Sequence, residues 1–110
     1  MLFSVGFLSD PANSGWSETP PSEDEEPPAG WLAAYQAQRN FDGRAELARI
    51  AAPTLVLAGD EDRLVPLSDA RALADGIPRA SLSVLAGSGH LINVELPVRF
   101  VTEVRAFLEM

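Results

Sequence analysis

The chain has 110 residues, sixteen acidic against eight basic side chains for a net charge of −8, and no cysteine. An acidic chain without a basic cluster repels phosphate backbones and anionic lipid, so we expect neither nucleic acid nor a membrane surface as a partner. The lack of cysteine excludes disulfides and thiolate metal sites.

The N-terminal residues 1–8 are apolar but carry none of the basic residues that open a signal peptide. No apolar run approaches the roughly 20 residues of a membrane-spanning helix, so we expect a cytoplasmic protein. Residues 9–30 hold five of the nine prolines, six acids and no basic residue. Such a stretch cannot bury enough apolar surface to offset its ordering entropy, which predicts a disordered acidic loop.

From residue 31 onward the pattern predicts helices and strands in alternation. Trp31–Arg39 is a candidate helix, and Asp42 is a candidate N-cap for a short helix over 43–50 that Pro53 ends. The remaining predicted elements are a strand over Thr54–Ala58, a helix capped by Ser68 and running to Asp75, a strand over Ser81–Leu85, and a final helix opened by Glu95-Leu96-Pro97. In the final helix Val98, Val101, Val104, Phe107 and Leu108 form one apolar stripe.

Two apolar strands joined through a helix are most simply parallel, with a right-handed crossover. A two-stranded parallel sheet rarely suffices by itself, because its faces and both its edges need cover. The sequence therefore predicts an α/β fold of βαβα order that resembles one end of a larger sheet.

An acidic loop and a histidine loop follow the two predicted strands. Asp60, Glu61 and Asp62 come directly after the first strand, and the only histidine, His90, lies in the glycine-rich loop 87–93 after the second. Neighbouring parallel strands lie about 4.8 Å apart and end at the same edge of the sheet. An acid on one loop can then accept the Nδ1 proton of His90, which fixes the tautomer and stabilises the imidazolium of a general base.

These segments resemble the C-terminal part of the α/β-hydrolase family. The resemblance is carried by PTLVLAGDEDRLVP at Pro53–Pro66, with the family's G-x-x-D pattern, and by GSGHLINVELP at Gly87–Pro97, with its histidine loop and E-x-P. It implies the last two strands of that fold, with a catalytic acid at Asp62 and a catalytic base at His90; Asp60 is the alternative acid. It divides the chain into a partial helical cap over 1–47, containing the disordered loop 9–30, and an α/β-hydrolase segment over 48–110.

The chain departs from the family pattern at the nucleophile. No G-x-S-x-G elbow is present, and neither is an oxyanion-hole segment of the HGGG type. Ser88 lies beside the histidine, where the family has no nucleophile, and the other candidates lie in the apolar start or the acidic loop: Ser4, Ser9, Ser14, Ser17 and Ser22. Because the nucleophile and the oxyanion donors supply most of the rate acceleration in acyl transfer, we expect this chain to be inactive alone.

Some of these residues have simpler interpretations. The three loop acids and His90 lack metal-ligand spacing, so we expect no metal and no cofactor. Trp31, Tyr35 and Phe41 could line a substrate cleft, but their helical spacing favours ordinary packing. After the histidine, Leu91, Ile92 and Val94 could contact substrate or anchor the loop, and the sequence does not rank these two interpretations.

The resemblance implies a parent enzyme that hydrolyses an ester, lactone or similar small carbonyl substrate through a Ser-His-Asp triad. One alternative is a remnant without activity. Another is a non-catalytic interaction module whose open sheet edge pairs with another chain or with a second copy of itself.

Overall fold

The computed structural model describes residues 2–18, 22 and 24–110. In chain order the elements are α1 (Val5–Ser9), the 3-10 helix η1 (Pro11–Asn13), α2 (Trp31–Asn40), the 3-10 helix η2 (Arg44–Arg49), β1 (Thr54–Gly59), α3 (Leu67–Gly76), β2 (Ala80–Leu85), α4 (Ile92–Glu95) and α5 (Pro97–Leu108). Among the described residues, none of the helices has the length and apolar character to cross a membrane.

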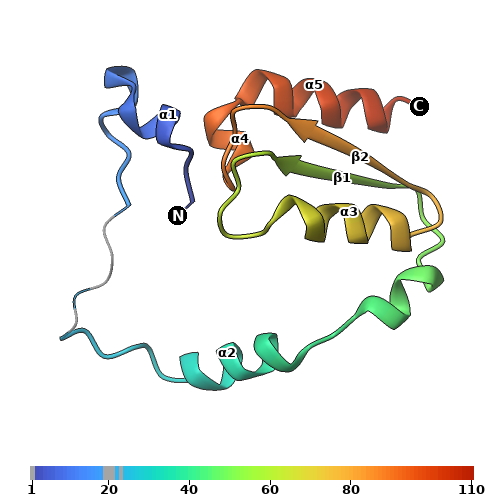
Figure 1. Cartoon of the computed structure of the whole chain (residues 1–110), viewed down its shortest axis with the longest axis horizontal. Coiled ribbons are helices and arrows are strands. Elements are labelled where there is room, and N and C mark those ends of the chain that lie inside the picture. The colour runs from blue at the N-terminus through green and yellow to red at the C-terminus, as the bar shows by residue number, and fades with distance from the viewer. Residues whose placement is uncertain (1, 19–21, 23) are drawn as a thin grey trace.

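The predicted parallel pair of strands is confirmed. β1 and β2 run parallel, with Thr54 opposite Ala80 and Gly59 opposite Leu85. Figure 1 shows α3 and α5 on opposite sides of the two strands. The α/β class and the βαβα order of the second half are therefore as expected.

The core is small. Its buried apolar side chains are Phe3, Ala58, Ala70, Ile77, Leu85 and Ile92. The stripe predicted on α5 forms on a helix but stays largely open, because Val98, Val101 and Leu108 are exposed and no residue of α5 is buried. Exposed apolar surface of this kind marks a face that another part of a protein normally covers.

The start of α3 differs from the prediction. The helix begins at Leu67 after Pro66, and no side chain caps it, so the prediction of Ser68 as N-cap is wrong. Proline fixes φ and its ring suits the turn into a helix, which explains why the helix starts two residues earlier. Over 43–50 the structure has the 3-10 helix η2 rather than an α-helix, although Asp42 still accepts a hydrogen bond from the Arg44 N–H.

The predicted disordered loop over 9–30 includes residues 19–21 and 23, which lie outside the described residues. Its first part has local structure, because Asp10 caps η1 and the Trp16 ring packs 5.6 Å from the Phe3 ring. The division of the chain at residue 47 and the disorder of the loop stay predictions. Helix α1, which the sequence did not suggest, begins after Ser4, whose Oγ accepts a hydrogen bond from the Phe7 N–H.

Candidate active site

The loops that follow β1 and β2 lie against each other at one edge of the sheet. The Asp60 N–H donates to the Leu85 carbonyl over 3.2 Å, and the Glu61 N–H donates to the Ser88 carbonyl over 2.9 Å. Gly59 permits this approach, because a Cβ there would lie 2.2 Å from the Ser88 carbonyl oxygen. The end of β1 must therefore be glycine for the acid loop and the histidine loop to meet.

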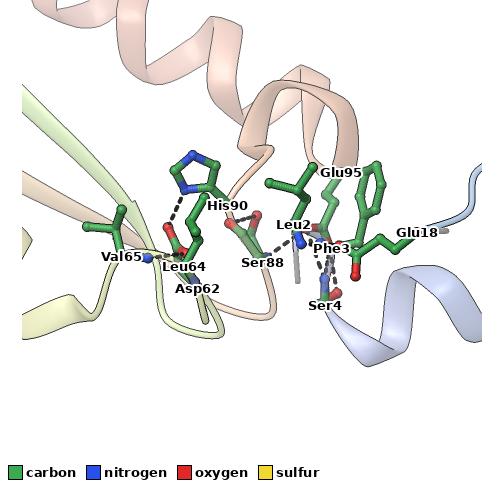
Figure 2. A network of polar contacts seen from close by, with 11 residues as sticks. Leu2, Phe3, Ser4, Glu18, Asp62, Leu64, Val65, Ser88, His90 and Glu95 are labelled. Atoms are coloured by element: carbon green, nitrogen blue, oxygen red, sulfur yellow. Dashed lines mark hydrogen bonds and ion pairs between the residues drawn. The ribbon is translucent and has the colours of Figure 1, made fainter. Parts of the chain in front are cut away.

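Asp62 and His90 are brought together at this edge. The Asp62 Oδ2 lies 2.8 Å from the His90 Nδ1, which is hydrogen-bonding distance (Figure 2). The other carboxylate oxygen, Oδ1, accepts hydrogen bonds of 2.9 Å from the N–H groups of Leu64 and Val65. A tight turn thus fixes the direction of the carboxylate toward the imidazole.

The surroundings of Asp62 keep it ionised. Burial acts to raise the pKa of this carboxyl, but the hydrogen bonds from the Val65 N–H, the His90 ring and the Leu64 N–H outweigh it. The pKa of Asp62 therefore lies below its usual value. A carboxylate that stays charged at neutral pH can hold the Nδ1 proton and stabilise a protonated imidazole.

His90 remains accessible while its partner does not. The side chain of Asp62 is 10% exposed, and that of His90 is 34% exposed. The second ring nitrogen of His90 points away from Asp62 (Figure 2). An imidazole held at Nδ1 and open at Nε2 can take a proton from, and return it to, a group that approaches from solvent or from another segment.

The two other acids of the loop have different positions. Asp60 accepts a 2.7 Å hydrogen bond from the Gly87 N–H instead of contacting His90. The side chain of Glu61 is exposed. The described residues contain no group of three or more histidine or acidic side chains that could hold a metal ion.

Two serines near the histidine loop are buried. Ser88 is 0% exposed, and its Oγ makes a long bond of 3.3 Å to the neighbouring Gly89 carbonyl. Ser4 is 3% exposed, and its Oγ donates to the Glu95 carboxylate over 2.5 Å. A hydroxyl enclosed in this way cannot reach a substrate carbonyl, so neither serine fits the role of nucleophile.

Sequence reasoning missed the residues that hold the histidine loop in place. Glu95 accepts a 2.7 Å hydrogen bond from the Gly89 N–H, and the Leu2 carbonyl accepts one of 2.8 Å from the His90 N–H. The E-x-P motif pointed at Glu95 only as a family marker. Nothing in the order of residues connects Leu2 with a loop 88 positions away (90 minus 2). After the histidine, Ile92 is buried and anchors the loop in the core.

The aromatic residues ahead of β1 are not packed in a core. Trp31 and Tyr35 stack with ring centroids 5.1 Å apart, and both remain exposed, as does Phe41. The interpretation of their spacing as ordinary packing is therefore wrong among the described residues. Figure 1 shows that α2 lies away from the two strands.

Comparison with known proteins gives the family. The chain matches the model of the alpha/beta hydrolase family over residues 2–104. It is 43% identical over 77 residues to the putative carbamate hydrolase RutD of Pseudomonas syringae, covering 70% of this chain and 30% of that protein. It is 35% identical over 80 residues to 3-oxoadipate enol-lactonase 2 of Acinetobacter baylyi, covering 73% of this chain and 30% of that protein.

Solved structures of hydrolases are similar to this chain as well. The serine hydrolase CarC, involved in carbazole degradation, superposes with a TM-score of 0.72 at 25% identity, over 98% of this chain and 43% of that one. A hydrolase from Pseudomonas aeruginosa superposes with a TM-score of 0.67 at 41% identity, over 74% of this chain and 30% of that one. The chain thus spans less than half the length of these relatives. On the family match and these similarities together, the chain belongs to the alpha/beta hydrolase family.

Proposed function

We propose that this chain supplies the acid and the base of a Ser-His-Asp hydrolase acting on an ester, lactone or related small carbonyl substrate. Asp62 is the acid, His90 is the base, and the nucleophile comes from a segment outside this sequence. The observation that carries the proposal is the 2.8 Å contact between Asp62 and the Nδ1 of a partly exposed His90. Both residues lie at the carboxyl ends of neighbouring parallel strands, where open α/β sheets place their chemistry.

In this proposal His90 takes the proton of the attacking hydroxyl at Nε2 as that oxygen bonds to the substrate carbonyl carbon. It then gives the proton to the leaving oxygen or nitrogen as the tetrahedral intermediate collapses. A water molecule repeats the sequence on the acyl-enzyme, with His90 again as base, and releases the acid product. Asp62 keeps the imidazole in the required tautomer throughout and stabilises its charged form.

The chain is inactive by itself in this proposal. The sequence has no nucleophile elbow, and the two serines near His90 are buried. The small core and the open stripe on α5 support a sheet that continues into another segment. The relatives are named as a carbamate hydrolase and an enol-lactonase, which supports the carbonyl substrate class.

A chimera tests the catalytic roles. Residues 48–110 replace the matching segment of the enol-lactonase relative, so that its own nucleophile faces His90. We expect hydrolysis of a chromogenic ester or of the lactone that falls on the order of 10⁶-fold in His90→Ala. Glu61→Ala on the same loop is the matched control and should leave the rate within about twofold, since its side chain is exposed. A chimera that folds, as near-ultraviolet circular dichroism reports, and hydrolyses neither substrate would contradict the proposal.

The chain alone gives the complementary measurement. With a short-chain p-nitrophenyl ester we expect the same background rate for the wild type and for His90→Ala. Turnover by the wild type that disappears in His90→Ala would place a nucleophile within this sequence and would overturn the inactivity proposed here.

A second candidate is an interaction module, and one observation favours it. The described sheet has two strands, so β1 and β2 each have an outer edge without a strand partner there. Unpaired edges recruit strands from other chains. Sizing chromatography with light scattering would give a defined dimer under this candidate, and a stable monomer at high concentration would count against it.

A further inference from the structure

The histidine loop is enclosed between two other segments. On one side lies the acid loop, where Gly59 and the Ser88 carbonyl are in backbone contact. On the other side lies the N-terminal segment, because a Cβ on Gly89 would lie 2.7 Å from the Ser4 nitrogen and 2.8 Å from the Phe3 carbonyl carbon. Neither side leaves room for a side chain. The position of His90 therefore depends on both neighbours.

The N-terminal segment is bonded directly to the histidine backbone. The Leu2 carbonyl accepts hydrogen bonds from the His90 N–H over 2.8 Å and from the Leu91 N–H over 3.2 Å. The Glu18 carboxylate in turn accepts from the N–H groups of Leu2 and Phe3, the latter over 2.7 Å. Figure 2 shows Leu2, Phe3 and Glu18 beside the histidine loop.

Glu95 joins the N-terminal segment to the histidine loop. Its carboxylate accepts from the Gly89 N–H over 2.7 Å, from the Ser4 Oγ over 2.5 Å and from the Ser4 N–H over 3.2 and 3.3 Å. Glu95 is the last residue of α4, and this one turn of helix brings its side chain back toward Gly89. Three donors from two distant segments thus meet at one half-buried carboxylate.

We propose that Glu95 is a positioning residue for His90. By holding Gly89 and Ser4 together it sets the backbone of the histidine loop so that the imidazole Nδ1 reaches Asp62. The catalytic consequence rests on the function proposed for His90, whereas the positioning itself does not. A carboxylate suits this site because both its oxygens accept, whereas an amide would turn an –NH₂ toward one of the three groups, and of these only the Ser4 hydroxyl can accept.

His90 allows a direct test on the chain as it stands. It is the only histidine, so the imidazole gives a single set of nitrogen-15 and proton signals. In the wild type at neutral pH we expect the Nδ1–H tautomer alone, with a downfield Nδ1 proton protected by Asp62. In Glu95→Gln we expect mixed tautomers and loss of that proton signal. The Gly89 amide, which loses its carboxylate acceptor, should exchange with solvent about tenfold faster or more. The His90 amide should exchange faster as well, because Glu95 no longer holds the N-terminal segment whose Leu2 carbonyl accepts from it.

Two further variants make the result decisive. Glu61→Gln removes the same charge from the exposed side of the acid loop and should leave the imidazole signals unchanged. Ser4→Ala removes one donor and keeps the carboxylate, so a smaller change in the same direction is expected. If Glu95→Gln fails to fold, the Ser4→Ala spectrum tests the positioning role instead. Imidazole signals and amide exchange in Ser4→Ala identical to the wild type would then overturn it.

The two proposals fail in different ways. If the wild-type imidazole shows no protected Nδ1 proton, the Asp62–His90 pair is contradicted. The exchange of the Gly89 amide in Glu95→Gln then still tests whether Glu95 holds the histidine loop. Glu95→Gln signals and amide exchange identical to those of the wild type would overturn the positioning role and leave the acid–base pair intact.

Discussion

The Asp60 carboxylate accepts a 2.7 Å hydrogen bond from the Gly87 N–H, while Asp62, two residues along, contacts the His90 ring. Gly87 has a φ of 77°, the left-handed conformation that favours glycine. Asp60 thus stabilises the turn that leads from β2 to the histidine, and Asp62 faces the imidazole that the turn presents. The two acids of this loop therefore have different partners: Asp60 binds the backbone of the turn, and Asp62 binds the histidine ring.

Removal of the Asp60 carboxylate should loosen the turn without separating Asp62 from His90. We expect Asp60→Ala to lower the free energy of unfolding by about 1 kcal/mol, since the Gly87 N–H loses its acceptor near the surface. Urea unfolding measures this loss, and Asp60→Asn, which keeps an acceptor oxygen, should retain most of the stability. An imidazole signal in Asp60→Ala that differs from the wild type would show that Asp60 also acts on His90.

The contribution of Asp62 to stability should depend on pH in the acid range. Its pKa in the folded state lies below the value of 3.8 that the unfolded chain has. The unfolded state therefore takes up the proton first as the pH falls, and the stability that Asp62 contributes is complete above pH 3.8. It is lost as the pH falls from there through the lowered folded pKa.

Urea unfolding of the wild type and Asp62→Asn at several pH values measures this dependence. We expect the difference in unfolding free energy between the two proteins to shrink as the pH falls below about 4. A difference that grows as the pH falls below about 4 would mean that folding destabilises the ionised form of the carboxyl.

Gly59 should tolerate no side chain. A Cβ there would lie 2.2 Å from the Ser88 carbonyl oxygen and 2.5 Å from the Gly89 carbonyl oxygen, and both belong to the backbone. We expect Gly59→Ala to cost about 2 kcal/mol or more, as overpacking does when the neighbours cannot move aside, and to separate Asp62 from His90. The matched control is Gly6→Ala, where a Cβ meets nothing within 4 Å. Equal stability of the two variants would contradict the close approach of the loops.

Leu85 should dominate the small core. It is 0% exposed at the end of β2, directly ahead of the histidine loop. We expect Leu85→Ala to cost about 2–5 kcal/mol through lost burial and the cavity that remains. Leu108→Ala, at a site that is 72% exposed, should change the stability by less than about 0.5 kcal/mol. Similar unfolding midpoints for both variants would show that the core lies elsewhere.

By itself the sequence determined the strands, their parallel pairing and the loops that carry the acid and the histidine. Continuous apolar runs of strand length predict strands of a parallel sheet, and a helix between two strands favours the parallel crossover. Once both strands end at one edge, the acid loop over 60–62 and His90 must lie near each other. Chain order is enough for this inference, because the constraint comes from backbone connectivity rather than from side-chain packing.

Only the tertiary structure decided which acid meets the histidine and what holds the histidine loop. Asp60 and Asp62 are equivalent in composition, and the direction of each side chain depends on the turn at Leu64 and Val65. The contact between Glu95 and Ser4 joins residues 91 positions apart, and no local preference encodes such a pairing. The exposure of Trp31 and Tyr35 was equally beyond the sequence, because periodicity defines a face of a helix but not what lies opposite that face.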